Sequence, residues 1–166
     1  MQEEIFDIVD ENNNVIGQAP RSECHGNPDL IHRTAHVVVY HSDGRILLQK
    51  RSHKKDLLGG LWDTAVGGHL DQGETFEEGA RREMNEELGI DRNADLEFIC
   101  YWKIRNSVES ENVAIYKLIA DGPFDYDHEE IDEVRFWTND ELLNPEMQSS
   151  FTPNLVEEVK YLLCKS

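Results

Sequence analysis

The segment from Gly67 to Ile90 constrains the fold most strongly, because it encodes both ends of a helix. Thr75 followed by Glu78 forms a capping box, in which the hydroxyl and the carboxylate satisfy free amide groups of the first turn. Gly89 supplies the left-handed residue that ends a helix after Leu88. We therefore predict a helix of about three to four turns that begins at Thr75.

Three glutamates lie on one face of this predicted helix, at positions i, i+3 and i+4, and they are Glu83, Glu86 and Glu87. An apolar stripe adjoins this face and consists of Ala80, Met84 and Leu88. Carboxylates this close repel one another, and a divalent ion that prefers oxygen ligands compensates the repulsion. A solvated acidic face is the simpler alternative for an isolated E-x-x-E-E pattern.

The pattern extends well beyond the three glutamates. The spacing G-x5-E-x7-R-E-U-x-E-E-x-G-U, where U is aliphatic, is matched by Gly68, Glu74, Arg82, Glu83, Met84, Glu86, Glu87, Gly89 and Ile90. This spacing is the Nudix box, and through it the chain resembles the Nudix hydrolases. A motif of this length has a far lower false-positive risk than a short glycine pattern.

The resemblance implies a metal-dependent pyrophosphatase that cleaves a diphosphate linkage in a small nucleoside-diphosphate-type substrate. Metal ions neutralise the diphosphate and lower the pKa of bound water, and a glutamate acts as general base. By correspondence with the box, Glu83, Glu86 and Glu87 hold Mg²⁺, with Mn²⁺ as the alternative ion. Glu74 and Arg82 orient these ligands. The identity of the general base stays open.

Outside the box, most of the chain resembles the isopentenyl diphosphate isomerase branch of the Nudix superfamily. The segment L-W-D-T-A-V-G-G-H around Trp62 carries part of this resemblance. It implies a metal site made by His25, His32 and His69. It also implies that the diphosphate is held by Arg21, Arg51 and Lys55. Glu109 or Glu111 corresponds to the carboxylates of the same metal site.

Two departures from the isomerases favour hydrolysis. The isomerases have a cysteine two residues before the site histidine, where this chain has Gly67. They also tend to have fewer glutamates in the box helix, whereas this chain keeps the full set. Isopentenyl diphosphate delta-isomerase and a noncatalytic module that binds a phosphorylated metabolite remain the alternatives. Mg²⁺ on the carboxylates is the first expectation, and zinc or manganese is favoured if the histidines assemble.

Composition argues against several other classes of function. The net charge of -18 opposes binding of a nucleic acid polymer, which requires a lysine and arginine footprint. Three widely spaced cysteines fit neither a disulfide framework nor a zinc motif. The sequence shows neither a signal-peptide pattern nor an apolar run of membrane-spanning length. We expect a cytoplasmic monomer or homodimer without a membrane partner.

The remaining sequence predicts strands with interspersed helices around one core, in a single domain of residues 1–166. The expected strands are 5–9, 15–18, 34–40, 45–51, 96–103, 113–120 and 134–137, with a polar loop at 105–112. Asp43-Gly44 is the turn of a predicted central hairpin. A short helix begins at Thr138 and is stopped by Pro145, and an amphipathic helix covers 155–163. The resemblance implies the α/β Nudix fold, an α/β/α sandwich with a mixed central sheet and an N-terminal hairpin.

Overall fold

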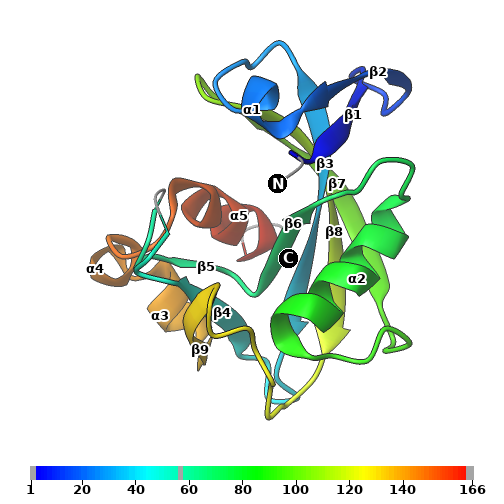
Figure 1. Cartoon of the computed structure of the whole chain (residues 1–166). Coiled ribbons are helices and arrows are strands. Elements are labelled where there is room, and N and C mark those ends of the chain that lie inside the picture. The colour runs from blue at the N-terminus through cyan, green and yellow to red at the C-terminus, as the bar shows by residue number, and fades with distance from the viewer. Residues whose placement is uncertain (1–2, 56–57, 164–166) are drawn as a thin grey trace.

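The computed structural model describes residues 3–55 and 58–163, in which a mixed nine-stranded sheet curls between helices. Helix α2 (Phe76–Leu88) covers one face of the sheet, and helix α5 (Pro153–Leu163) covers the opposite face (Figure 1). A separate buried apolar cluster lies under each of these two helices. The predicted α/β class, with helices on both faces of a mixed sheet, is confirmed.

Strand β3 (Ile31–Tyr40) is the centre of this arrangement. It pairs in parallel with β8 (Ser110–Ile119) along its whole length and antiparallel with β6 (Val66–His69). Successive side chains of a strand point to opposite faces of the sheet. The cluster under α2 accordingly contains Ala35, Val37 and Val39, whereas Val38 belongs to the cluster under α5.

The predicted central hairpin requires a correction. Strand β4 (Ile46–Arg51) follows β3 through the expected turn, but in the described part of the chain the two strands pair only at Tyr40 and Ile46. Strand β4 instead pairs with β5 (Trp62–Thr64) and with β9 (Ile131–Trp137). The two arms therefore diverge beyond the turn, because each finds longer ladders with other strands.

The predicted N-terminal hairpin is confirmed as β1 (Ile5–Val9) and β2 (Val15–Pro20), followed by the short helix α1 (Arg21–Cys24). Asp7 connects this hairpin to the rest of the protein. Its carboxylate accepts hydrogen bonds from Arg33 of β3 at 3.0 Å and from the amide of Gly73 at 2.9 Å. The hairpin therefore holds the loop that leads into α2.

Two further boundaries differ from the prediction. Strand β7 (Glu97–Arg105) pairs with β8, and β8 already begins at Ser110, so the predicted loop at 105–112 is shorter than expected. Helix α3 (Asn139–Leu143) starts at the predicted capping box, but Pro145 also begins a further short helix, α4 (Pro145–Gln148). Across the described residues, every helix is too short or too polar to cross a membrane.

Candidate active site

A cleft of about 430 Å³ lies beside the diverging strands, and side chains of β3 to β6, α2 and α5 contribute to its walls. Its described lining includes nine carboxylates, namely Glu4, Asp63, Asp71, Glu83, Glu86, Glu87, Glu109, Glu111 and Glu130. The lysine and arginine side chains among the lining residues number only four, namely Arg21, Arg51, Lys55 and Arg82. A cleft with this excess of carboxylates accepts an anionic ligand only together with additional cations.

Helix α2 brings three of these carboxylates to the cleft. The predicted capping box forms, since Thr75 accepts from the amide of Glu78 and the Glu78 carboxylate accepts from the amide of Thr75. Gly89 ends the helix with φ 68°, in the left-handed region. The predicted apolar stripe is buried under the helix and consists of Ala80, Met84 and Leu88. Glu83, Glu86 and Glu87 therefore lie on the side of α2 that faces the cleft.

Arg82 organises the side chains around these carboxylates. Its Nε and Nη2 donate to the two carboxylate oxygens of Glu74 at 2.8 and 2.9 Å. Its Nη1 donates to Glu83 at 2.8 Å and to Glu86 at 3.2 Å. Nη2 also donates to the carbonyl oxygen of His69 at 3.1 Å. The rigid guanidinium fork thus joins the helix, the loop before it and strand β6 in one charge-assisted network.

At Gly68, strand β6 approaches the Glu83 side chain of α2 closely. A Cβ atom on Gly68 would lie 2.3 Å from the carboxyl carbon of Glu83, and the amide of Gly67 donates to Glu87 Oε2 at 3.3 Å. Burial and the neighbouring Glu83 raise the pKa of Glu87 well above its ordinary value, and burial also raises the pKa of Glu83. Such an under-compensated set of carboxylate oxygens fits a hard divalent cation.

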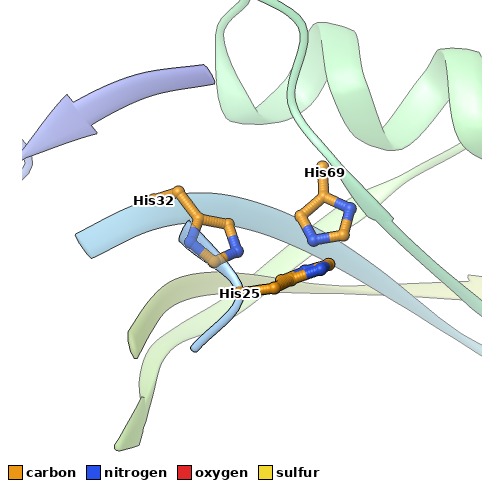
Figure 2. Close-up of side chains that lie close together, drawn as sticks. All are labelled: His25, His32 and His69. Carbon is orange, nitrogen blue, oxygen red and sulfur yellow. The ribbon is translucent and has the colours of Figure 1, made fainter. Parts of the chain in front are cut away.

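A second group of possible ligands lies at another part of the same cleft. His25 after α1, His32 on β3 and His69 on β6 turn their rings toward one another (Figure 2). One nitrogen from each ring lies within 4.8 Å of those of the other two, and His32 forms a similar group with Glu109 and Glu111. The sequence therefore brings together five side chains of metal-binding type from four separate segments.

Three buried ring nitrogens of this histidine group lack hydrogen-bond partners within the part of the chain that the structure describes. Both nitrogens of His32 and Nε2 of His69 are buried without a hydrogen-bond partner among the described residues. Glu111 Oε2 is 3.4 Å from His32 Nε2 and 3.9 Å from His69 Nε2, without the geometry of a hydrogen bond. Burial lowers the pKa of His69 to about 3, which keeps the ring neutral. Buried imidazole nitrogens without partners, beside carboxylates, fit a borderline metal ion such as zinc or manganese.

Most of the predicted site residues share this cleft. The lining contains Arg21, His25, Arg51, Lys55, His69, Arg82, Glu83, Glu86 and Glu87. Glu74 and His32 lie behind the lining, in contact with Arg82 and near Glu111, respectively. The predicted diphosphate-binding cations each have an acidic neighbour: Arg21 is near Glu4, Arg51 near Asp63, and Lys55 contacts Glu130.

One wall of the cleft is formed by residues that were not predicted as site residues from the sequence. This wall is lined by Thr34, His36, Gln49, Asp63, Thr64 and Asn154. Behind it, the buried carboxylate of Glu158 lies 2.9 Å from Nδ1 of His36. One signal was available: Glu158 follows Leu155 by three residues and precedes Leu162 by four, so it interrupts the apolar face of the C-terminal helix.

The His36–Glu158 pair predicts a specific pH dependence of stability. Burial opposes the charged imidazole, but Glu158 outweighs it, with smaller contributions from Glu111 and Asp63, and raises the pKa of His36 to about 9. Because the folded-state pKa is raised, the stabilisation is complete below the ordinary value of about 6.5 and is lost as the pH rises through 9. We expect the free energy of unfolding to fall by up to about 3 kcal/mol over this window. Urea unfolding checks this, and equal pH slopes in wild type and Glu158→Gln would contradict it.

Comparison with known proteins places this geometry in a family. The sequence model of the NUDIX domain matches residues 30–159. A Yersinia pestis protein described as an uncharacterized Nudix hydrolase is 36% identical over 165 residues, which cover 98% of this chain and 87% of that protein. YfcD of Escherichia coli K12, which carries the same description, is 36% identical over 141 residues, covering 84% of this chain and 76% of YfcD.

A solved structure shows the same fold. The crystal structure of DR0079 from Deinococcus radiodurans superposes with a TM-score of 0.83 at 24% sequence identity. The match covers 96% of this chain and 99% of that one. The similarity therefore extends over the N-terminal hairpin as well as the box helix.

Proposed function

The chain belongs to the Nudix family, and from that premise we propose that it is a Mg²⁺-dependent hydrolase of a small nucleoside-diphosphate-type compound. The observation that carries this proposal is the arrangement of Glu83 and Glu86 around Arg82, with Glu87 in the same cleft, whose described lining has nine carboxylates and four lysine or arginine side chains. A diphosphate carries negative charge itself, so it enters such a cleft as a metal complex.

Each group in the proposed site has a definite task. Glu83, Glu86 and Glu87 would hold the ion, which, when bound, neutralises the diphosphate and acidifies water. One of these glutamates, or another cleft carboxylate, accepts the proton of the attacking water. Arg82 and Glu74 fix the directions of the ligands through their hydrogen-bond network. Arg21, Arg51 and Lys55, around the same cleft, bind the diphosphate oxygens.

The lining of the cleft favours hydrolysis of a diphosphate with a polar leaving moiety over isomerisation of the isoprenyl chain of isopentenyl diphosphate. Gly67 lies where an isomerase has its cysteine, and neither Cys24 nor Cys100 is among the described lining residues. Among those residues, Leu58 and Val108 are the only ones with a purely aliphatic side chain. A moiety rich in hydrogen-bonding groups, such as a sugar or a base, matches this lining better than an isoprenyl chain does. The resemblance to the isomerase branch stays a prediction.

A panel assay tests the proposed function. Phosphate and pyrophosphate release is measured with Mg²⁺, and then with Mn²⁺, from nucleoside diphosphates, nucleotide sugars and isopentenyl diphosphate. Turnover of one nucleotide class is expected and would begin to identify the leaving moiety. Conversion of isopentenyl diphosphate to its isomer without phosphate release would instead support the isomerase, and tight binding without any turnover would support a noncatalytic module.

The histidine group supports a second proposal, a zinc or manganese site formed by His25, His32 and His69 with Glu109 and Glu111. The orphaned buried nitrogens of His32 and His69 carry this proposal. Burial and Glu111 raise the pKa of Glu109 to about 7, a carboxyl that a bound cation would ionise.

Removing one imidazole tests this second site without an activity assay. We expect His32→Asn to lower the affinity for zinc or manganese by more than about tenfold, because a buried ligand is lost. Equilibrium dialysis with metal analysis measures the change, and His128→Asn serves as a control outside the group. Equal metal contents in wild type and His32→Asn would contradict the assignment.

A further inference from the structure

His36 is a buried histidine that belongs to neither proposed metal site. It lies on β3, opposite Gly67 of β6 in the antiparallel register, and only 8% of its surface is exposed. Its side chain lines the cleft, whereas its Nδ1 contacts Glu158 Oε2 at 2.9 Å behind the wall. The ring therefore connects a buried carboxylate on α5 with the space in which a substrate would bind.

Glu158 is a costly residue at its position. It is 1% exposed and lies between buried apolar neighbours on α5. Among the described residues, its carboxylate contacts His36 at 2.9 Å and accepts a hydrogen bond from the hydroxyl of Thr64 at 3.4 Å. Burying a carboxylate is unfavourable unless it is paired and hydrogen-bonded. A purely anchoring role for α5 would be met by an apolar contact, so the pair calls for a further explanation.

The Cδ2–Nε2 edge of the His36 ring, next to Gly67, offers an explanation for the buried pair. A Cβ atom on Gly67 would lie 3.3 Å from Cδ2 and 3.4 Å from Nε2 of His36, so the glycine leaves this edge uncovered. The amide of the same Gly67 donates to Glu87 Oε2. His36 Nε2 and one of the proposed metal ligands are thus neighbours of a single glycine, on the wall of one cleft.

The charge of His36 defines what this edge can bind. With Glu158 beside Nδ1, the imidazole is protonated at neutral pH, because its pKa is raised to about 9. An imidazolium has two N–H donors and no lone pair, so it cannot ligate a metal. Its Nε2–H instead suits an anionic oxygen, as a charge-assisted donor in a cleft that is otherwise dominated by carboxylates.

We propose that His36, held in place by Glu158, donates its Nε2–H to a phosphoryl oxygen of the substrate. The negative charge of this oxygen is the part that the metal at the box helix does not neutralise. His36 is then a substrate-binding residue, and Glu158 is a positioning residue that acts through it. The inference rests on the proposed diphosphate hydrolase function and adds to it a binding group that the Nudix box does not contain.

The test uses the Mg²⁺ complex of methylenediphosphonate, whose P–C–P bridge resists hydrolysis. Isothermal titration calorimetry on the full chain compares wild type, His36→Gln, Glu158→Gln and the control His41→Gln. His41 is a suitable control because it also lies beside carboxylates, Asp43 and Asp121, but outside the described lining of the cleft. We expect His36→Gln to weaken binding by about ten- to a hundredfold, since a hydrogen bond to a charged group is lost, and His41→Gln to leave it unchanged.

The substitution Glu158→Gln distinguishes two roles of Glu158: positioning His36 for substrate binding, and merely anchoring helix α5. The amide still accepts from Nδ1 but no longer favours the imidazolium, so we expect KM for a substrate found in the panel to rise while kcat changes little. In wild type, nitrogen-15 NMR of the imidazole groups is expected to show a shift of His36 Nε2, and not of His41, when the analogue is added. This measurement requires no variant, so it tests the role of His36 even if a substitution prevents folding.

The outcomes separate this inference from the proposed function. Turnover by wild type, together with unchanged analogue binding in a folded His36→Gln or an unshifted His36 signal, would overturn the role of His36 and leave the hydrolase intact. A wild type that neither binds the analogue nor hydrolyses any compound of the panel would overturn both.

Discussion

Replacing Glu87 by glutamine is expected to reduce Mg²⁺-dependent hydrolysis by at least about a thousandfold while the protein stays folded. The substitution removes one negative charge at nearly constant volume, and Glu87 lies in the cleft beside Glu83 and the amide of Gly67. Because burial and Glu83 raise the pKa of Glu87, its neutralisation relieves repulsion in the metal-free protein. We therefore expect the unfolding free energy without metal to be unchanged or higher, and stabilisation by Mg²⁺ to be weakened.

Steady-state kinetics and thermal unfolding with and without Mg²⁺ measure these effects. Glu77→Gln is the matched control, because Glu77 lies on the same helix, has a 61% exposed side chain and is absent from the described lining. A wild-type rate in Glu87→Gln would disprove the assignment of the metal site to α2.

A methyl group at Gly68 is expected to reduce turnover by about a hundredfold with little effect on stability. The Cβ of Gly68→Ala would lie 2.3 Å from the carboxyl carbon of Glu83 and 2.6 Å from each carboxylate oxygen. This overlap is relieved by rotation of a flexible side chain, so the fold survives. Glu83 then leaves the position in which Arg82 holds it. The site loses a correctly placed ligand, and displacements of about 1 Å cost large factors in rate.

The control for this substitution is Gly17→Ala in β2, where a Cβ atom would have no neighbour within 4 Å. Kinetics at saturating Mg²⁺ and urea unfolding are compared for both variants. If Gly68→Ala hydrolyses the substrate at the wild-type rate, the close approach of β6 to α2 has no role in placing Glu83.

Local signals in the sequence predicted the parts of the fold that depend on local chemistry. Helix α2 is capped by Thr75 and Gly89, as predicted, because a capping box and a left-handed glycine are properties of a few neighbouring residues. The N-terminal hairpin and most strand positions followed from β-branched runs and turn residues in the same way. These interactions need no knowledge of the distant chain.

The parts of the fold and of the cleft that the sequence did not predict depend on pairing between segments that are distant in the chain. Asp43-Gly44 is a strong turn signal, yet the strands beside it diverge, because β8, β6, β5 and β9 offer longer ladders than the hairpin does. The same divergence brings His36 and Asp63 to the wall of the cleft. The pairing of His36 with Glu158 joins residues 122 positions apart, and no local pattern specifies it.

The most direct test of the central claim is hydrolysis in oxygen-18 water, with the phosphate products followed by phosphorus-31 NMR as the Mg²⁺ concentration is varied. Attack by water on phosphorus at the box helix predicts oxygen-18 in one phosphoryl product, with a rate that rises with Mg²⁺ and falls in Glu87→Gln. Products that contain no oxygen-18, or a rate indifferent to the divalent ion, would contradict the assignment of Glu83, Glu86 and Glu87 as a metal-dependent hydrolytic site.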